Sequence, residues 1–195
     1  MINDRTAVFI DGAYFDKLLE LEFQRVRVDF HAFVKNAAED DNVFRTYYYH
    51  CRPYMSTVPS SEEQHRYEAK ERFFNALSAL PRFEVRLGRL VYRGQDENDR
   101  PIFVQKLVDI MLGVDLVRLA ATRQITRAIL VAGDSDFVPA VEEAKRQGVL
   151  LSLFHGPIKG TQNASSGTVH RELWDACDER FELTQDFVNS IQRAV

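Results

Sequence analysis

The chain is poor in the residues that mark several protein classes. Only two of its 195 residues are cysteines, Cys51 and Cys177, and their spacing argues against a disulfide-stapled secreted module. Its five histidines show no metal-ligand spacing of the H-x-x-x-H kind. The longest apolar runs are far too short to cross a bilayer, and the N-terminus lacks the basic start and cleavage site of a signal peptide. We therefore expect a reduced, cytoplasmic protein with no membrane partner.

The composition is that of an ordinary globular protein, with 45% hydrophobic and 28% charged residues. The length suits one domain with a sizeable core, and we expect a single domain over residues 1–195. The formal net charge is −4, so the chain as a whole is not a polycation. Any contact with nucleic acid must therefore come from a local basic patch.

Apolar strands alternate with helical segments along the chain. Buried strands are expected at residues 6–10 (TAVFI), 43–51 (VFRTYYYHC), 127–134 (RAILVAGD) and 149–156 (VLLSLFHG). Strands of this kind, separated by helices, predict an α/β fold with a mostly parallel sheet that helices cover on both faces. In such sheets, binding sites lie just beyond the carboxyl ends of the strands.

Three aspartates fall at those strand ends. Asp11 comes directly after the first apolar run. Asp134 and Asp136 come after the apolar run 129–131, and His155 ends the apolar run that starts at residue 149. Each has a structural alternative, because Asp-Gly is common turn chemistry and an aspartate in a β–α loop caps the next helix. His155 has the pKa range of a proton shuttle, but we favour its interpretation as a satisfied structural histidine.

A fourth aspartate, Asp109, lies in a strongly apolar segment that predicts a largely buried helix. A buried carboxylate needs a partner, which is either Lys106, three residues earlier, or a metal ion. Asp115 comes six residues after Asp109 and therefore points to a different face of the helix. We favour Asp109 as the site residue and interpret Asp115 as a surface or packing charge.

Several carboxylates at one strand-end cleft repel each other and remain ionised together only when a cation neutralises them. Oxygen ligands suit Mg²⁺ or Mn²⁺. Such ions, held by carboxylates, activate water and stabilise the departing oxygen in phosphodiester hydrolysis. The acidic pattern therefore favours a metal-dependent phosphodiesterase.

Three segments occur in an order and at a spacing that are typical of one protein family. They are VFIDGAYF near the start, QKLVDIMLGVDLVRLA in the middle, and ILVAGDSDFVPAVEEAKRQGVLLSLF after it. Together with the tail SSGTVHRELWDACDERFEL, they resemble the NYN domain, a PIN-like nuclease fold, and specifically its LabA-like bacterial branch. The resemblance covers most of the chain. It implies a Rossmann-like three-layer α/β/α sandwich, a divalent-metal site and ribonuclease activity, with RNA as the partner; a homo-oligomer is left open.

The family pattern maps onto individual positions. Its first-strand Asp falls on Asp11, its Lys-x-x-Asp on Lys106 and Asp109, and its Gly-Asp-x-Asp-Phe on residues 133–137. The resemblance thus implies that Asp11, Asp109 and Asp134 are catalytic and bind Mg²⁺ or Mn²⁺, with Asp136 in or beside the ligand shell. Ser135 is a candidate hydrogen-bond donor to a phosphate, or simply a helix cap. Lys106 would orient Asp109 or balance its charge.

One position departs from the family pattern. The family often has an Asn three residues after its first Asp, and this chain has Tyr14, which has no amide oxygen. The departure favours an alternative function, a catalytically weak or inactive module that binds RNA or a protein partner. Two other enzyme classes fit less well: a haloacid-dehalogenase-type phosphatase needs Asp-x-Asp after the first strand, and a Toprim-type site needs an early Glu.

Residues 82–104 fit the core pattern poorly and predict a β-hairpin elaboration. A bulge at Gly88 would bring Arg86, Arg89 and Arg93 onto one solvent-facing side, where they could contact the RNA backbone. The alternative is an ordinary solvated strand face that pairs with acids across the turn. Residues 47–49, three consecutive tyrosines, would offer a stacking surface for bases or, more simply, pack in the core.

Overall fold

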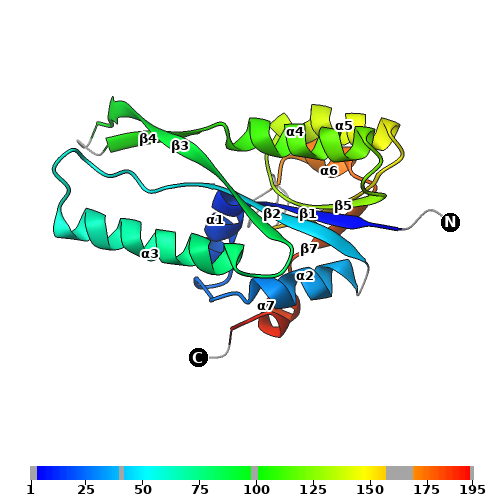
Figure 1. Cartoon of the computed structure of the whole chain (residues 1–195), viewed down its shortest axis with the longest axis horizontal. Helices are drawn as coiled ribbons and strands as arrows, with labels where there is room; N and C mark the ends of the chain where they lie inside the picture. Colours follow the sequence, from blue (N-terminus) through cyan, green and yellow to red (C-terminus); the bar gives the residue numbers. More distant parts are fainter. Residues whose placement is uncertain (1–3, 40–41, 98–100, 157–168, 194–195) are drawn as a thin grey trace.

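The computed structural model describes residues 4–39, 42–97, 101–156 and 169–193, and its seven described strands form one sheet (Figure 1). The strand order is β4-β3-β2-β1-β5-β6-β7, and every neighbouring pair is parallel except β3 and β4. The strands are β1 (Thr6–Asp11), β2 (Val43–Cys51), β3 (Phe83–Gln95), β4 (Pro101–Lys106), β5 (Arg127–Val131), β6 (Leu150–His155) and β7 (Glu179–Glu182). The predicted α/β fold with a mostly parallel sheet is confirmed.

Helices cover both faces of this sheet, as Figure 1 shows. The helices are α1 (Gly12–Glu22), α2 (Phe30–Ala38), α3 (Ser61–Ser78), α4 (Val108–Ala121), α5 (Val138–Arg146), α6 (Arg171–Ala176) and α7 (Gln185–Ser190), with a short 3₁₀ turn η1 (Ser135–Phe137). Helices α4, α5 and α6 enclose one hydrophobic core, and α1, α2, α3 and α7 enclose the other. The three layers match the predicted sandwich.

Strand β1 forms the centre of both cores, because all six of its residues are buried. Phe9 contributes to the core under α4, whereas Ile10 contributes to the core under α1. The tyrosines of β2 divide in the same way, and each is at most 2% exposed. Their burial supports the core interpretation and excludes a base-stacking surface at residues 47–49.

The predicted hairpin is present as β3 and β4, and its turn at residues 98–100 lies outside the described residues. The predicted bulge at Gly88 is wrong: pairing with β2 is regular up to Gly88, pairing with β4 is regular from Arg89 to Tyr92, and the register shifts only after that. Gly88 has a different role. A Cβ atom there would lie 2.4 Å from the backbone oxygen of Lys106, so only glycine allows the chain to pass so closely.

Helix α4 only partly matches the expectation of a largely buried helix. Its inner face packs on the sheet through buried residues such as Leu112 and Leu116. Its outer face leaves Leu107, Ile110 and Val114 exposed by 47%, 66% and 58%. The helix is therefore apolar on two sides, of which the structure buries one.

Strand β7 forms the edge of the sheet opposite β4, and α6 directly precedes it in the chain. Trp174, the chain's one tryptophan, lies between the guanidinium groups of Arg171 and Arg180, whose carbons are 4.4 and 4.5 Å from its ring centroid. Cys51 and Cys177 are buried free thiols, as expected for small apolar residues. None of the described helices is long and apolar enough to span a membrane.

Candidate functional site

Asp11 is the most enclosed of the predicted site residues. It ends β1 and caps α1, and its Oδ1 accepts hydrogen bonds from the backbone nitrogens of Ala13 (3.0 Å) and Tyr14 (3.1 Å). Its side chain is buried, with an exposure of 8% for the residue. Burial, together with the nearby charge of Asp109, raises the pKa of Asp11 to about 6 against the lowering effect of the two backbone hydrogen bonds.

Asp134 and Asp136 lie just beyond β5. Asp134 caps η1 through a hydrogen bond from the backbone nitrogen of Asp136 to its Oδ1 (3.1 Å), so the predicted capping role is present. Both residues are exposed, while Phe137 anchors the turn in the core. Ser135 lies between them at the start of η1 and is half-buried. The capping bond occupies one oxygen of Asp134, and the exposed position leaves the carboxylate open to solvent.

Asp109 completes the group from a third segment, the first turn of α4. It is exposed rather than buried. Partial burial raises its pKa, and the charges of Asp134 and Asp136 raise it as well. The structure therefore brings together the four predicted aspartates, from β1, α4 and the loop after β5: the charges of Asp134 and Asp136 act on Asp109, and the charge of Asp109 acts on Asp11. We call these four residues the acidic cluster.

The acidic cluster is not a closed coordination shell. Within the described residues, no three Asp, Glu, His or Cys side chains are close enough together to enclose a metal ion. The donor set nevertheless suits Mg²⁺ or Mn²⁺, because it consists of carboxylate oxygens that repel one another. Three of the four side chains are also exposed, so their rotamers are free to change on binding.

Lys106 does not pair with Asp109 as one alternative proposed: no ion pair joins the two in the described part of the chain. Both residues, with Asp136, instead line a groove of about 960 Å³ along the outer face of α4. Most of the remaining lining is aliphatic. Lys106 is exposed at the edge of the acidic cluster and forms no ion pair with any other described residue.

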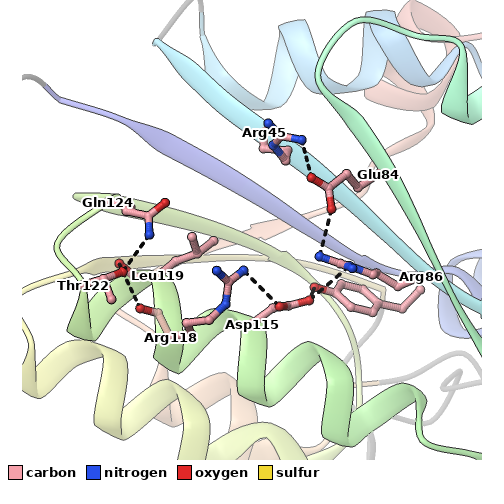
Figure 2. Close-up of polar contacts among 9 residues, drawn as sticks. Arg45, Glu84, Arg86, Asp115, Arg118, Leu119, Thr122 and Gln124 are labelled. Atoms are coloured by element: carbon pink, nitrogen blue, oxygen red, sulfur yellow. Dashed lines mark hydrogen bonds and ion pairs between the residues drawn. The ribbon is translucent and has the colours of Figure 1, made fainter.

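Asp115 has the separate role that its position on the helix predicts, although it is buried rather than on the surface, with 9% exposure. It accepts a hydrogen bond from the hydroxyl of Tyr49 (3.0 Å). It also pairs with Arg118 (3.2 Å) and with Arg86 (3.5 Å), as Figure 2 shows. This aspartate holds α4 to β2 and β3.

The predicted alignment of three arginines on one face of the hairpin is wrong. Arg86 turns toward α4, where it bonds Glu84 (2.8 Å) and Asp115 and lies over the ring of Tyr47 (Figure 2). Regular strand alternation puts Arg89 on the opposite face, because no bulge intervenes. Arg89 and Arg93 are exposed, so they remain available to a polyanion, whereas Arg86 belongs to an internal ion-pair network.

Tyr14 stands at the position where the family often has Asn, and its contacts were not predicted from the sequence. Its ring fills the space above Gly133, where a Cβ atom would lie 2.3 Å from the ring, and its hydroxyl accepts a hydrogen bond from the backbone nitrogen of Gly156 (2.9 Å). Burial raises its pKa to about 12. Tyr14 therefore fastens the loop after β5 to the loop after β6. His155, beside that bond, is buried and bonded to the oxygen of Gly156 (2.6 Å), which favours the structural interpretation.

Sequence reasoning missed a second polar group beside the acidic cluster. Asp16 of α1 accepts hydrogen bonds from Lys70 of α3 (2.7 Å) and pairs with His50 at the end of β2 (3.2 Å). His50 lies near enough to Asp11 for its charge to lower the pKa of that carboxyl. The strand-end rule would have found His50, since it follows the same edge of the sheet. Asp16 and Lys70 carry no such signal.

Comparisons with known proteins agree with this architecture. The NYN domain family matches residues 5–183. An uncharacterized protein of Sinorhizobium fredii, y4oD, is 32% identical over 110 residues, which are 56% of this chain and 45% of that protein, so the match spans less than half of the relative. A crystal structure of a Vibrio parahaemolyticus protein of unknown function, VPA0982, has the same fold, with a TM-score of 0.67, 20% identity, and coverage of 95% and 96% of the two chains. The narrower LabA-like assignment stays a prediction, but the family match covers most of the chain, and the chain belongs to the NYN family of PIN-like nuclease folds.

Proposed function

We propose that this protein is a divalent-metal-dependent ribonuclease that uses the acidic cluster. The observation that carries the proposal is the meeting of aspartates from three separate segments at one edge of the sheet, where burial, and then the charge of neighbouring aspartates, raises the pKa of Asp11 and of Asp109. Folded proteins rarely gather like charges without a counter-charge, and a divalent cation would supply one. Membership in a family of PIN-like nucleases supports the same chemistry.

In this proposal Asp11, Asp109 and Asp134 hold Mg²⁺ or Mn²⁺, with Asp136 in the same shell or next to it. The bound ion supplies an activated water and stabilises the departing oxygen of a phosphodiester. The two backbone hydrogen bonds to Asp11 fix one of its oxygens and so orient the other. Lys106, exposed and without an ion pair to Asp109, would contact a substrate phosphate.

The first test is cleavage of end-labelled single-stranded RNA by the purified protein in Mn²⁺, Mg²⁺ or EDTA. We expect cleavage with either ion and none with EDTA, and a loss of at least a hundredfold in Asp134→Asn and Asp109→Asn, on the order of a lost catalytic ligand. Asp186→Asn, at an exposed aspartate of α7, is the matched control and should keep full activity. Activity that survives both cluster substitutions would contradict the proposal.

A second candidate function is a binding module without catalysis. Two observations favour it: Tyr14 replaces the usual Asn, and no described trio of side chains encloses a metal ion. Calorimetric titration with Mn²⁺ separates the candidates, because a binding module has no need of the ion. No heat of binding, together with RNA affinity that EDTA leaves unchanged, would support the binding module and reject the nuclease.

A further inference from the structure

The outer face of α4 carries a regular apolar seam. Leu107, the N-cap residue of α4, and Ile110, Val114, Val117 and Ala121 of the helix follow one another at alternating spacings of three and four residues. This is the a/d pattern by which one helix packs along another. The three largest exposed side chains of the seam are 47–66% accessible, in contrast to the buried inner face of the same helix. Four of the five seam residues, all except Ala121, line the groove beside the acidic cluster.

We propose that this seam binds the same seam of a second copy of the chain, with the two α4 helices antiparallel about a two-fold axis at Val114. In that register Val114 meets its own counterpart, Ile110 meets Val117, and Leu107 meets Ala121. Each layer then pairs side chains of complementary or equal size, and the largest residue meets the smallest. A two-fold contact of this kind buries the same patch on both copies.

The charges beside the seam match the same arrangement. Asp109 and Arg118 both line the groove, near opposite ends of α4. Antiparallel pairing about Val114 brings each Asp109 opposite Arg118 of the second copy, so that unlike charges meet at both ends. The side chain of Arg118 is 48% exposed, and one nitrogen of its guanidinium group pairs with Asp115, which leaves the other N–H donors for a further partner. The second copy would therefore bring an arginine to the edge of each acidic cluster.

The chemistry of the seam favours a helix over RNA as its occupant. Bases bind protein surfaces by stacking on aromatic or guanidinium planes, and none of the five seam residues is aromatic or basic. A run of aliphatic side chains at heptad spacing instead matches a second helix with the same spacing. The inference does not depend on the proposed ribonuclease activity, because it concerns association alone.

Sedimentation of the 195-residue chain over a range of concentrations tests the association. We expect the wild type to approach twice the mass of one chain as concentration rises, while Ile110→Lys and Val114→Lys remain at the mass of one chain. Leu21→Lys is the matched control, because Leu21 is an aliphatic residue of α1 with 44% exposure, and it should behave as the wild type. A wild type that stays at the mass of one chain throughout would overturn the proposal.

Cross-linking tests the register independently of folding effects. Val114→Cys should link to its own counterpart through a short bis-maleimide, since the two-fold axis passes beside it, whereas Leu21→Cys should not. The native thiols are buried and give little background. A dimer in which Val114→Cys fails to link, or links no better than Leu21→Cys, would reject this seam as the interface. Protection of Val114→Cys by an RNA oligonucleotide, in a chain that does not dimerise, would likewise reject it in favour of RNA.

Discussion

Burial of the Asp11 carboxyl group opposes folding, because an ionised carboxylate loses free energy of hydration when it leaves water. Asp11 is buried at the end of β1, and two backbone hydrogen bonds only partly offset its loss of hydration. Its pKa is raised to about 6 from 3.8. The folded protein therefore holds this proton more tightly than the unfolded chain does, so folding becomes less favourable as pH rises from about 4 to about 6.

Asp11→Asn should stabilise the metal-free protein above pH 6. The amide carries no charge to bury, and asparagine caps a helix as well as aspartate. The gain in the free energy of unfolding should reach roughly 1–3 kcal/mol at neutral pH and vanish below about pH 3, where the wild-type carboxyl is protonated in both states. Urea denaturation in EDTA at several pH values measures it. A gain that does not change with pH would contradict the assigned cause.

The strand-end aspartates were predictable, because apolar runs ending in Asp11 and Asp134 are visible in the sequence and parallel strands bring their carboxyl ends to one edge. The choice of Asp109 over Asp115 followed from helical periodicity. The position of Tyr14 could not be predicted, since its partners, Gly133 and Gly156, lie in two other loops. Only the assembled sheet brings those three segments together.

At the scale of elements, α4 carries two aspartates with different roles. We expect Asp115→Asn to lower the free energy of unfolding by about 2 kcal/mol, the lower end for a broken buried pair because Arg86 and Arg118 are each more than a third exposed. Asp109→Asn should change it by no more than about 0.5 kcal/mol. Urea denaturation of both variants in EDTA measures the difference. Equal losses would mean that the two roles are not separate.

The close passage of β3 beside the start of α4 makes a second element-scale prediction. Gly88→Ala should destabilise the protein by about 1–3 kcal/mol, because its Cβ would press on the backbone oxygen of Lys106. Gly113→Ala, inside α4, is the control: its nearest contact would be an ordinary 3.5 Å to Ala140, and it should stabilise the helix by up to about 1 kcal/mol. Thermal unfolding at low protein concentration compares them. If Gly88→Ala left the stability unchanged, the backbone of β3 and β4 would be able to move apart there without a cost in free energy.

The helices and strands could be predicted from the sequence more closely than the contacts that they make with one another. The hairpin near residues 82–104 was predicted, but Gly88 suggested a bulge when it serves a close backbone contact. Local alternation in one strand cannot distinguish the two, since the contact comes from β4. In the same way, the apolar composition of α4 predicted a largely buried helix, and composition does not reveal how much of a helix its neighbours cover.

For the molecule as a whole, a net charge of −4 means that RNA would approach through local cations. Arg89 and Arg93 are exposed on the hairpin, while Arg86 is held in ion pairs. In RNA titrations at several salt concentrations, Arg89→Ala and Arg93→Ala should each reduce the salt dependence by about 0.7 in the logarithmic slope, the value for one phosphate contact with a single strand. Arg86→Ala should leave the slope unchanged. A uniform slope across the three variants would place RNA elsewhere on the protein.

The mostly parallel sheet with helices on both faces could be predicted because apolar strands separated by helices have few alternative arrangements. The partner surfaces could not, because they depend on which side chains the sheet leaves outside. The seam on α4 is visible as a heptad spacing in the sequence, yet the same spacing would suit a helix packed on the sheet. Only the exposure of Ile110 and Val114 distinguishes the two.

The position of Trp174 gives this molecule an internal optical probe. Its indole is held between two guanidinium groups beside β7, at the opposite end of the sheet from the hairpin. Tryptophan emission therefore reports the loss of packing at that end alone, while far-ultraviolet circular dichroism reports the backbone of the whole chain. When both signals change together, the sheet unfolds as one cooperative unit. When dichroism changes first, unfolding begins away from β7, and a single native residue is enough to detect it.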